Sequence, residues 1–423
     1  MKNSASSVFF IAFRYLLGRA KEGGRYLRGA VAGIALSLIP IVVTLIVADG
    51  MIRGITDRFI ELGTSHLQAY NFNDAEDLDS IIEKLPLVDG VTGHWKERQS
   101  LGILHGKDGK TGVNIRAVEP SFWEDEGSKQ YLEVLDGSSI LETDREILLG
   151  TALAQNLGIK VGDTVRLMTV RVTSTGNNIP RLTPLTVKGI VSSGYRELDA
   201  SWCLMTYSMG TQILPADMSN NHLLIKIDDA YENADRISAA LVSLFGPRHW
   251  VYTWKELQRS QYSSYESTRQ ILLFIMALIV MVAAVNVSSA ASMLALERQK
   301  DIAVLKAFGT SPKSTSGIFL SASLLTGIFG SIFGITLGLI IGRFINQIIR
   351  GIEWFLGIVS SIFGGGTVTI LDPEYYLEEI PIIIDWKAIA AIFFFTVLCS
   401  VIASWIPSRR AGKISPTELL RKN

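Results

Sequence analysis

Four long stretches without a charged side chain limit what this chain can fold into. They cover residues 29–48, 270–296, 314–342 and 388–408, and contain 20, 27, 29 and 21 residues. A helix rises about 1.5 Å per residue, so about 20 apolar residues cross the roughly 30 Å hydrocarbon layer of a bilayer. Residues 50–268 hold most of the charged side chains and contain no such stretch. The sequence therefore predicts a membrane protein with one large water-facing domain.

The distribution of Lys and Arg predicts the orientation. Residues 1–28 contain six basic side chains and one acid, and residues 297–313 and 409–423 are also rich in Lys and Arg. The middle of 343–387 is acidic instead. Because basic flanks stay in the cytoplasm, both termini and 297–313 are expected inside, and 50–268 and 343–387 outside.

The predicted organisation follows from these spans and flanks. It comprises a cytoplasmic interfacial helix (1–28), a first span (29–49), a periplasmic α+β domain with a stalk (50–268), a second span (269–296), a cytoplasmic coupling segment (297–313), a third span (314–342), a periplasmic loop (343–387), a fourth span (388–408) and a cytoplasmic tail (409–423). The predicted fold class is a membrane α-helical bundle of four transmembrane helices with a large α+β extracytoplasmic domain.

The outer domain combines helical and strand patterns. Apolar residues around 152–157 favour a helix, and alternation favours strands over 164–172, 183–191 and 201–206. The turn-rich, polar stretch 173–180 predicts a protruding hairpin loop between the first two strands. A further helical pattern over about 254–270 leads into the second span and predicts a stalk.

Neither a catalytic group nor a metal site is expected on this chain. The 40 basic and 40 acidic side chains balance, which disfavours nucleic-acid binding. Gly109-Lys110-Thr111 is similar to the end of a P-loop, but Leu104 stands where that motif needs glycine. The five histidines show no metal-binding spacing, and there is no GxSxG motif. No cofactor is therefore expected.

One stripe of small residues predicts close helix packing. Gly330, Gly334, Gly338 and Gly342 recur every four residues along the third predicted span. A line without side chains lets a neighbouring helix approach closely. We interpret it as a packing groove rather than a substrate site.

The segment between the second and third spans is amphipathic. Ile302, Leu305 and Phe308 recur every three residues among charged side chains, and Gly309 is placed to end the helix. Such a helix can insert its apolar face into a groove of a partner protein. Composition alone leaves open a surface segment without a partner.

Residues 296–311 resemble the coupling helix of the MacB/FtsX superfamily of ABC-transporter permeases. The tail 405–421 resembles the C-terminal signature of that superfamily, and 148–163 resembles part of its outer core domain. The order of one span, a large outer domain and three spans is also similar. The resemblance implies a set of residues that contact a cytoplasmic ATPase subunit: Glu297, Arg298, Asp301, Ile302, Leu305, Lys306, Phe308 and Gly309.

Within the superfamily, three stretches are similar to the lipoprotein-releasing permeases LolC and LolE. They are Asp49-Gly50-Met51 followed by 63–66, the stretch 352–357, and Ile380-Pro381 with Asp385-Trp386. This resemblance implies a permease subunit that uses ATP hydrolysis by a partner to extract lipoproteins from the outer leaflet of the bacterial cytoplasmic (inner) membrane. The lipoprotein then passes to a periplasmic carrier.

The same resemblance implies the partners. ATP and Mg would be bound by the partner ATPase, and a second permease subunit, identical or related, would complete the membrane part. The carrier would dock on the hairpin at Ile179, Pro180 and Arg181. Two alternatives remain open: an efflux permease similar to MacB, although no fused ATPase domain is present in this sequence, and a regulator of a cell-wall hydrolase similar to FtsX.

Overall fold

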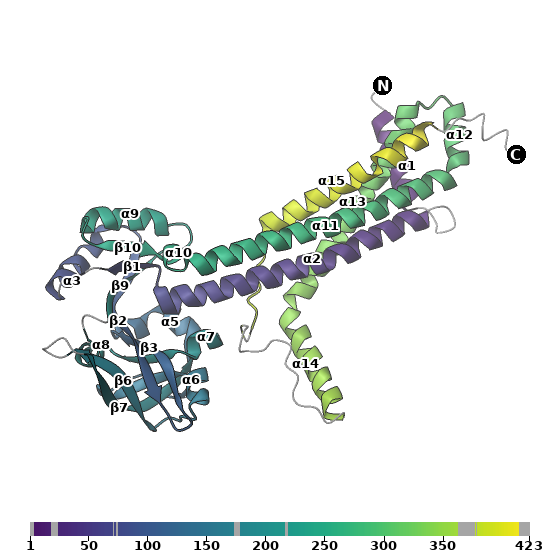
Figure 1. The fold of residues 1–423 in the computed structure, drawn as a ribbon. Helices are drawn as coiled ribbons and strands as arrows, with labels where there is room; N and C mark the ends of the chain where they lie inside the picture. Colours follow the sequence, from purple (N-terminus) through teal and green to yellow (C-terminus); the bar gives the residue numbers. More distant parts are fainter. Residues whose placement is uncertain are drawn as a thin grey trace. The chain divides into compact units, whose positions relative to one another are not determined.

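The computed structural model describes residues 4–17, 24–70, 72, 75–172, 178–215, 219–362, 377 and 379–413. Its contacts divide the chain into two units (Figure 1). The helical unit comprises Met1–Gly50, Tyr265–Ile358 and Pro381–Asn423, and the sheet unit comprises Met51–Ser264 and Val359–Ile380.

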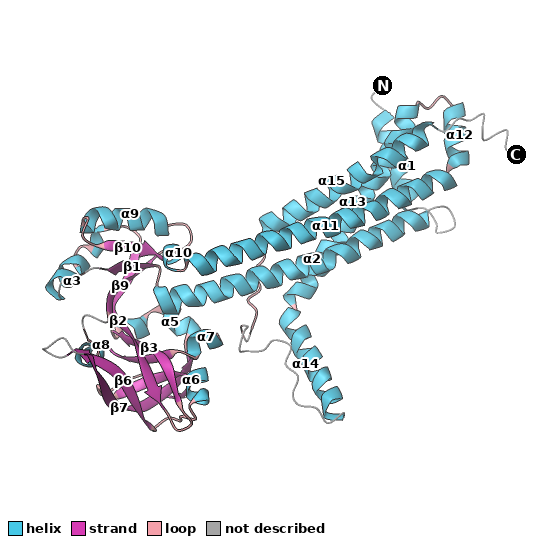
Figure 2. Ribbon diagram, in the orientation of Figure 1, coloured by secondary structure: helices cyan, strands magenta, loops and turns pink. Residues whose placement is uncertain are grey.

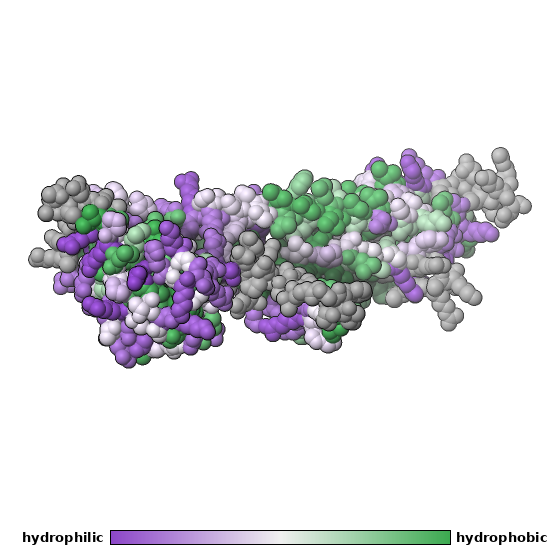
Figure 3. Space-filling view, turned by 60° about the horizontal axis from the view of Figure 1, so that its bottom comes forward, coloured by the Kyte–Doolittle hydropathy of each residue, from purple (hydrophilic) through white to green (hydrophobic). Residues whose placement is uncertain are grey.

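Among the described residues, four helices are long and apolar enough to cross a membrane, as the sequence predicts. They are α2 (Gly24–Arg58), α11 (Arg259–Glu297), α13 (Pro312–Arg343) and α15 (Trp386–Lys413). Each is longer than its uncharged stretch, because a helix that leaves the hydrocarbon layer can continue with polar side chains in water. Figure 3 shows hydrophobic side chains concentrated on the surface of the helical unit. Exposed residues such as Phe274 on α11 and Phe394 on α15 are suited to contact lipid.

Three shorter helices complete the helical part: α1 (Ser4–Leu17), α12 (Gln299–Ala307) and α14 (Ile345–Ile362). The predicted interfacial helix at the N-terminus corresponds to α1, which packs against α13 through residues that include the fully buried Ala12. The prediction of a loop over 343–387 is wrong for its first part, which is the helix α14. Apolar residues recurring at helical spacing, including Ile348, Ile352 and Phe355, explain that helix. Residues 363–376 and 378 lie outside the described residues.

In the part of the sheet unit that the structure describes there are ten strands and several short helices (Figure 2). The strands are β1 (Leu67–Tyr70), β2 (Val91–His105), β3 (Lys110–Val118), β4 (Glu133–Gly137), β5 (Glu146–Gly150), β6 (Thr164–Val172), β7 (Asn178–Ser192), β8 (Trp202–Thr206), β9 (Asn220–Ile227) and β10 (Trp250–Thr253). The helices are α3 (Ala75–Ile82), α4 (Ser121–Glu124), α5 (Glu126–Tyr131), α6 (Thr151–Asn156), α7 (Arg196–Asp199), α8 (Tyr207–Ile213), α9 (Ala234–Phe245) and α10 (Trp254–Leu257).

Strand pairing closes one part of this sheet into a ring. The pairs run from β2 through β3, β8, β5, β7 and β6 back to β2. Inward-facing residues of these strands, such as Ile115, Leu149 and Leu167, form one buried core. Cys203 lies in this core, and burial raises the pKa of its thiol to about 12, so it remains protonated and serves as an apolar side chain.

The remaining strands form a layer with helices packed on it. β9 pairs with β1, and β1 with β10, and residues of α3 and α9 join their core. This core includes Leu223 and Ile225 of β9, Ile237 of α9 and Trp254 of α10.

A buried ion pair holds the segment that follows α2 against the sheet. That segment is a π-helix, Phe59–Thr64. Arg116 Nε donates to Glu97 Oε1 at 2.6 Å and Arg116 Nη2 to Glu97 Oε2 at 2.8 Å, and both side chains are almost fully buried. Arg116 Nη1 also donates to the Leu62 carbonyl of the π-helix. Because a buried charge is costly when unpaired, this geometry fixes the π-helix on the sheet.

Candidate functional site

The buried side of α12 joins it to the rest of the helical unit. Ile302 is 1% exposed and lies in a cluster with Ala12 of α1, Leu27 of α2, Phe319 of α13 and Ala411 of α15. The prediction that Ile302 enters a partner's groove together with Leu305 and Phe308 is therefore wrong. Residues three apart are offset by about 60° around an α-helix, so Ile302 and Phe308 differ by about 120° and face different surroundings.

The exposed side of α12 carries two apolar residues one turn apart. Phe308 is 86% exposed and Val304 is 55% exposed. Glu297 and Gly309 are also exposed, and Gly309 ends the helix with φ +88°. Sequence reasoning missed Val304, although its spacing of four from Phe308 was the available signal. These residues form the exposed side of α12 and its carboxyl end.

Three of the expected coupling residues are held by contacts within the chain. Arg298 Nη1 donates to Asp301 Oδ2 at 2.9 Å, and Lys306 Nζ donates to the Gly412 carbonyl at 2.6 Å. A cation at the carboxyl end of a helix satisfies carbonyls that have no partner within the helix. Lys306 therefore joins α12 to the end of α15. Leu305 is half-buried and lines a cavity with Val8 and Ile11 of α1.

The glycine stripe of α13 faces one side of α2. A Cβ added at Gly330 would lie 2.8 Å from Ile34 Cβ, and one at Gly338 would lie 2.7 Å from Val42 Cβ. Gly334 and Gly342 stand equally close to residues of α2, Leu38 and Ile46. The apolar residues of α2 and the glycines of α13 therefore have the same four-residue spacing, so each glycine faces one apolar residue of α2.

A polar cluster joins three of the spanning helices within the helical unit. Arg269 of α11 contacts Asp49 of α2 at 2.9 Å and Asp385, just before α15, at 2.7 Å. Asp385 Oδ1 also accepts hydrogen bonds from the backbone N–H groups of Lys387 and Ala388, which caps α15. The sequence signal was present, because each of these charges stands near the end of an uncharged stretch.

The expected carrier-binding residues lie in a strand rather than in a loop. Ile179, Pro180 and Arg181 belong to β7 and pair with Arg171, Val170 and Thr169 of β6. Among the described strand pairings, this end of β7 pairs only with β6 and therefore forms an edge of the sheet. Such an edge tolerates proline, because the backbone N–H that proline lacks is not needed for a second neighbouring strand. Ile179 is 44% exposed, and Arg181 Nη1 donates to the Gln212 carbonyl at 3.0 Å. Residues 173–177 of the expected loop lie outside the described residues.

Comparison with protein families covers both units. The MacB-like periplasmic core domain matches residues 29–244, which is just over half of the chain. The FtsX-like permease C-terminal domain matches residues 273–416, which include α12 and the glycine stripe. The chain belongs to the MacB/FtsX superfamily of ABC-transporter permeases. The predicted fold class of membrane helices with a large α+β domain is thereby confirmed.

Individual relatives of this permease align over nearly its full length. The lipoprotein-releasing system transmembrane protein LolC of Neisseria meningitidis serogroup B is 28% identical over 421 residues, covering 97% of this chain and 98% of the relative. The protein named LolE of Haemophilus influenzae is 22% identical over 426 residues, with the same coverage. Among solved structures, the periplasmic region of MacB from Actinobacillus actinomycetemcomitans is similar at 16% identity and a TM-score of 0.31, covering 48% of this chain and 95% of that one.

Proposed function

We propose that this permease is the membrane subunit of an ABC transporter that releases lipoproteins from the outer leaflet of the bacterial cytoplasmic membrane. Partner subunits bind and hydrolyse ATP, and a periplasmic carrier receives the lipoprotein. The observation that carries the proposal is the alignment of relatives named as parts of a lipoprotein-releasing system with 97% of this chain. A second permease subunit, identical or related, completes the membrane part.

The contacts of α12 support a route from ATP hydrolysis to the membrane helices. A cytoplasmic ATPase subunit binds the exposed side of α12 at Val304 and Phe308. Because Ile302 is packed among α1, α2, α13 and α15, a displacement of α12 moves their cytoplasmic ends. The hydrogen bond from Lys306 to Gly412 adds a direct connection to α15.

The energetics of the cargo explain why such a task needs ATP and a direct transfer. Moving an acyl chain from lipid into water costs about 0.8 kcal/mol per CH₂ group. A protein held by more than one acyl chain is therefore stably anchored, and its release needs work and an apolar site that receives the chains.

A reconstituted system tests the proposal. The permease is purified with its ATPase subunits, inserted into proteoliposomes that contain an acylated lipoprotein, and mixed with a soluble periplasmic carrier. We expect ATP-dependent transfer of the lipoprotein to the carrier, and none with a non-hydrolysable ATP analogue. ATP-dependent transport of a small amphiphile without lipoprotein release would indicate an efflux permease. Binding of a cell-wall hydrolase without transport would indicate a regulator.

The end of the β6–β7 hairpin is the expected docking site for the carrier. Pro180 fixes its own backbone angle, which reduces the entropy lost on docking, and Ile179 offers an exposed apolar contact. Changing Ile179 and Arg181 together to Ser is expected to lower carrier cross-linking by about tenfold, as for the loss of one interface contact of moderate strength. ATP hydrolysis in the absence of carrier is expected to stay unchanged.

The control for this prediction is Leu87→Ser, which removes an apolar side chain that is 74% exposed before β2 in the same unit, apart from the β6–β7 hairpin in the chain. It is expected to leave cross-linking at the wild-type level. Cross-linking that survives the change of Ile179 and Arg181 would place the carrier elsewhere on the outer domain.

A further inference from the structure

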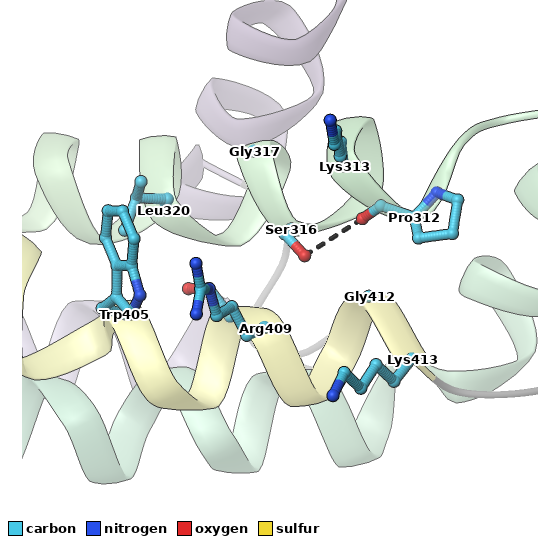
Figure 4. A pocket seen from close by; sticks show the side chains of 10 residues that line it. Pro312, Lys313, Ser316, Gly317, Leu320, Trp405, Arg409, Gly412 and Lys413 are labelled. Atoms are coloured by element: carbon cyan, nitrogen blue, oxygen red, sulfur yellow. Dashed lines mark hydrogen bonds between the residues drawn. The ribbon is translucent and has the colours of Figure 1, made fainter.

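A cavity of about 510 Å³ opens between α13 and α15 at the end of the bundle that the distribution of Lys and Arg places in the cytoplasm. Its volume lies within the range of small-molecule sites. Figure 4 shows Arg409 reaching from α15 toward α13, beside Trp405. Leu320 and Trp405 line one part of the cavity, and Lys313, Arg409 and Lys413 line another.

The charged part of the cavity is suited to an anion. Among the described residues, no carboxylate forms an ion pair with Lys313, Arg409 or Lys413. The Arg409 guanidinium lies 4.9 Å from the ring centroid of Trp405, and this stacking limits its movement before any ligand binds. The cavity also includes the first turn of α13, where a long helix carries partial positive charge.

The negative partial charge at the carboxyl end of α15, which would repel an anion in the cavity, is already neutralised. The carboxyl end of α15 carries partial negative charge, which disfavours an anion nearby. Lys306 Nζ donates to the Gly412 carbonyl at that end. The cations and the first turn of α13 therefore dominate the local field.

A buried hydroxyl in the cavity lacks a partner. Ser408 lines the cavity and is 2% exposed, and its Oγ forms no hydrogen bond with any described residue. By contrast, Ser316 on the facing helix donates to the Pro312 carbonyl at 3.0 Å (Figure 4). A buried polar group without a hydrogen bond costs free energy, so the Ser408 hydroxyl is expected to be satisfied by a ligand.

We propose that this cavity binds the phosphate headgroup of an anionic phospholipid from the cytoplasmic leaflet. Arg409 and Lys413 pair with the phosphate, the Ser408 hydroxyl donates a hydrogen bond to the headgroup, and the acyl chains lie along Leu320 and Trp405. Basic pockets between membrane helices on the cytoplasmic side suit such headgroups, and an apolar wall beside the cations distinguishes a lipid from a free phosphate ion. The lipid would fill the gap between α13 and α15 beside the contact of Lys306 with Gly412.

Native mass spectrometry of the full-length permease in detergent tests this proposal. Phosphatidylglycerol, phosphatidylcholine and inorganic phosphate are titrated separately. The wild-type protein is expected to bind phosphatidylglycerol most tightly. Changing Arg409 and Lys413 together to Gln is expected to weaken that binding by about thirtyfold, because each cation near a lipid headgroup contributes on the order of a fivefold gain. The matched control changes the exposed Arg410 and Lys300 to Gln, which removes the same charge outside the cavity.

The results separate the possible ligands. Equal weakening in the two double variants would overturn the proposal, because binding would then follow net charge. Equal affinity for phosphatidylcholine and phosphatidylglycerol would also overturn it. Displacement of the lipid by inorganic phosphate at millimolar concentration would overturn it as well, because the cavity would then be a site for the free ion. If the variant changed at Arg409 and Lys413 does not fold, Ser408→Ala tests the proposal instead. We expect this variant to bind the lipid several-fold more weakly and to keep the wild-type melting temperature. Unchanged lipid binding would overturn the proposal.

Discussion

Changing Phe308 to Asp is expected to abolish ATP-driven transport while the permease still folds and reaches the membrane. The side chain is 86% exposed, so the change disturbs no internal packing. An ATPase groove that receives an aromatic side chain would have to bury an unpaired carboxylate, which is costly. Loss of a central interface contact of this kind weakens association by about thirtyfold or more. Copurification of the ATPase subunits and ATP-dependent release measure the effect.

Two further variants distinguish a contact with the ATPase from a folding defect. Phe308→Leu keeps an apolar side chain and is expected to retain most of the activity. Ile302→Asp places a charge in the buried cluster and is expected to lower the amount of folded protein itself. Leu305→Asp is less informative, because Leu305 is half-buried and lines a cavity with residues of α1. Its change would therefore alter both the contact with the ATPase and the folding of the permease. Full copurification of the ATPase with Phe308→Asp would show that this side of α12 is not the coupling surface.

Gly334→Leu and Gly338→Leu are each expected to prevent stable assembly of the helical unit. A Cβ at Gly338 would already lie 2.7 Å from Val42 Cβ, and one at Gly334 would lie 2.9 Å from Ala35 Cα of the α2 backbone. Three more carbon atoms would force the helices apart along the whole stripe. Overpacking of this kind costs about 3 kcal/mol or more, and close approach is what stabilises such pairs in lipid. The yield of monodisperse protein in detergent and its melting temperature measure the loss.

The control for the glycine stripe is Gly351→Leu in α14, where an added Cβ would meet nothing within 4 Å. It is expected to behave like the wild type. A compensating pair, Gly338→Ala with Val42→Ala, is expected to recover part of the stability lost by Gly338→Ala alone, because the two residues share one contact. If Gly334→Leu and Gly338→Leu were as stable as Gly351→Leu, the packing of α13 on α2 would be contradicted.

Several elements were predictable from the sequence because local physics decides them. A charged side chain is costly inside a bilayer, so the uncharged stretches predict α2, α11, α13 and α15 without knowledge of any contact. An alternating pattern after a glycine turn predicts β6, whose bounds agree with the prediction. The strand β9 was not predicted, because six of its eight residues are buried on both faces of the strand, polar His222 and Lys226 among them, so its apolar residues do not alternate.

The functional surfaces depended on tertiary contacts. Periodicity shows that the segment 297–309 has an apolar side, but a helix cannot specify by itself whether its own chain or another protein covers that side. Packing against α1, α2, α11, α13 and α15 buries Ile302 and leaves Phe308 of the same segment outside, which is a property of six helices together. The glycine stripe likewise predicts a close neighbour, and only the structure shows that the neighbour is α2. The cavity beside Ser408 is lined by residues of both α13 and α15, which approach so closely at Gly412 that an added Cβ would lie 2.1 Å from Ser316 Oγ. Such a site arises from the distance between two helices, which the sequence of neither helix determines alone.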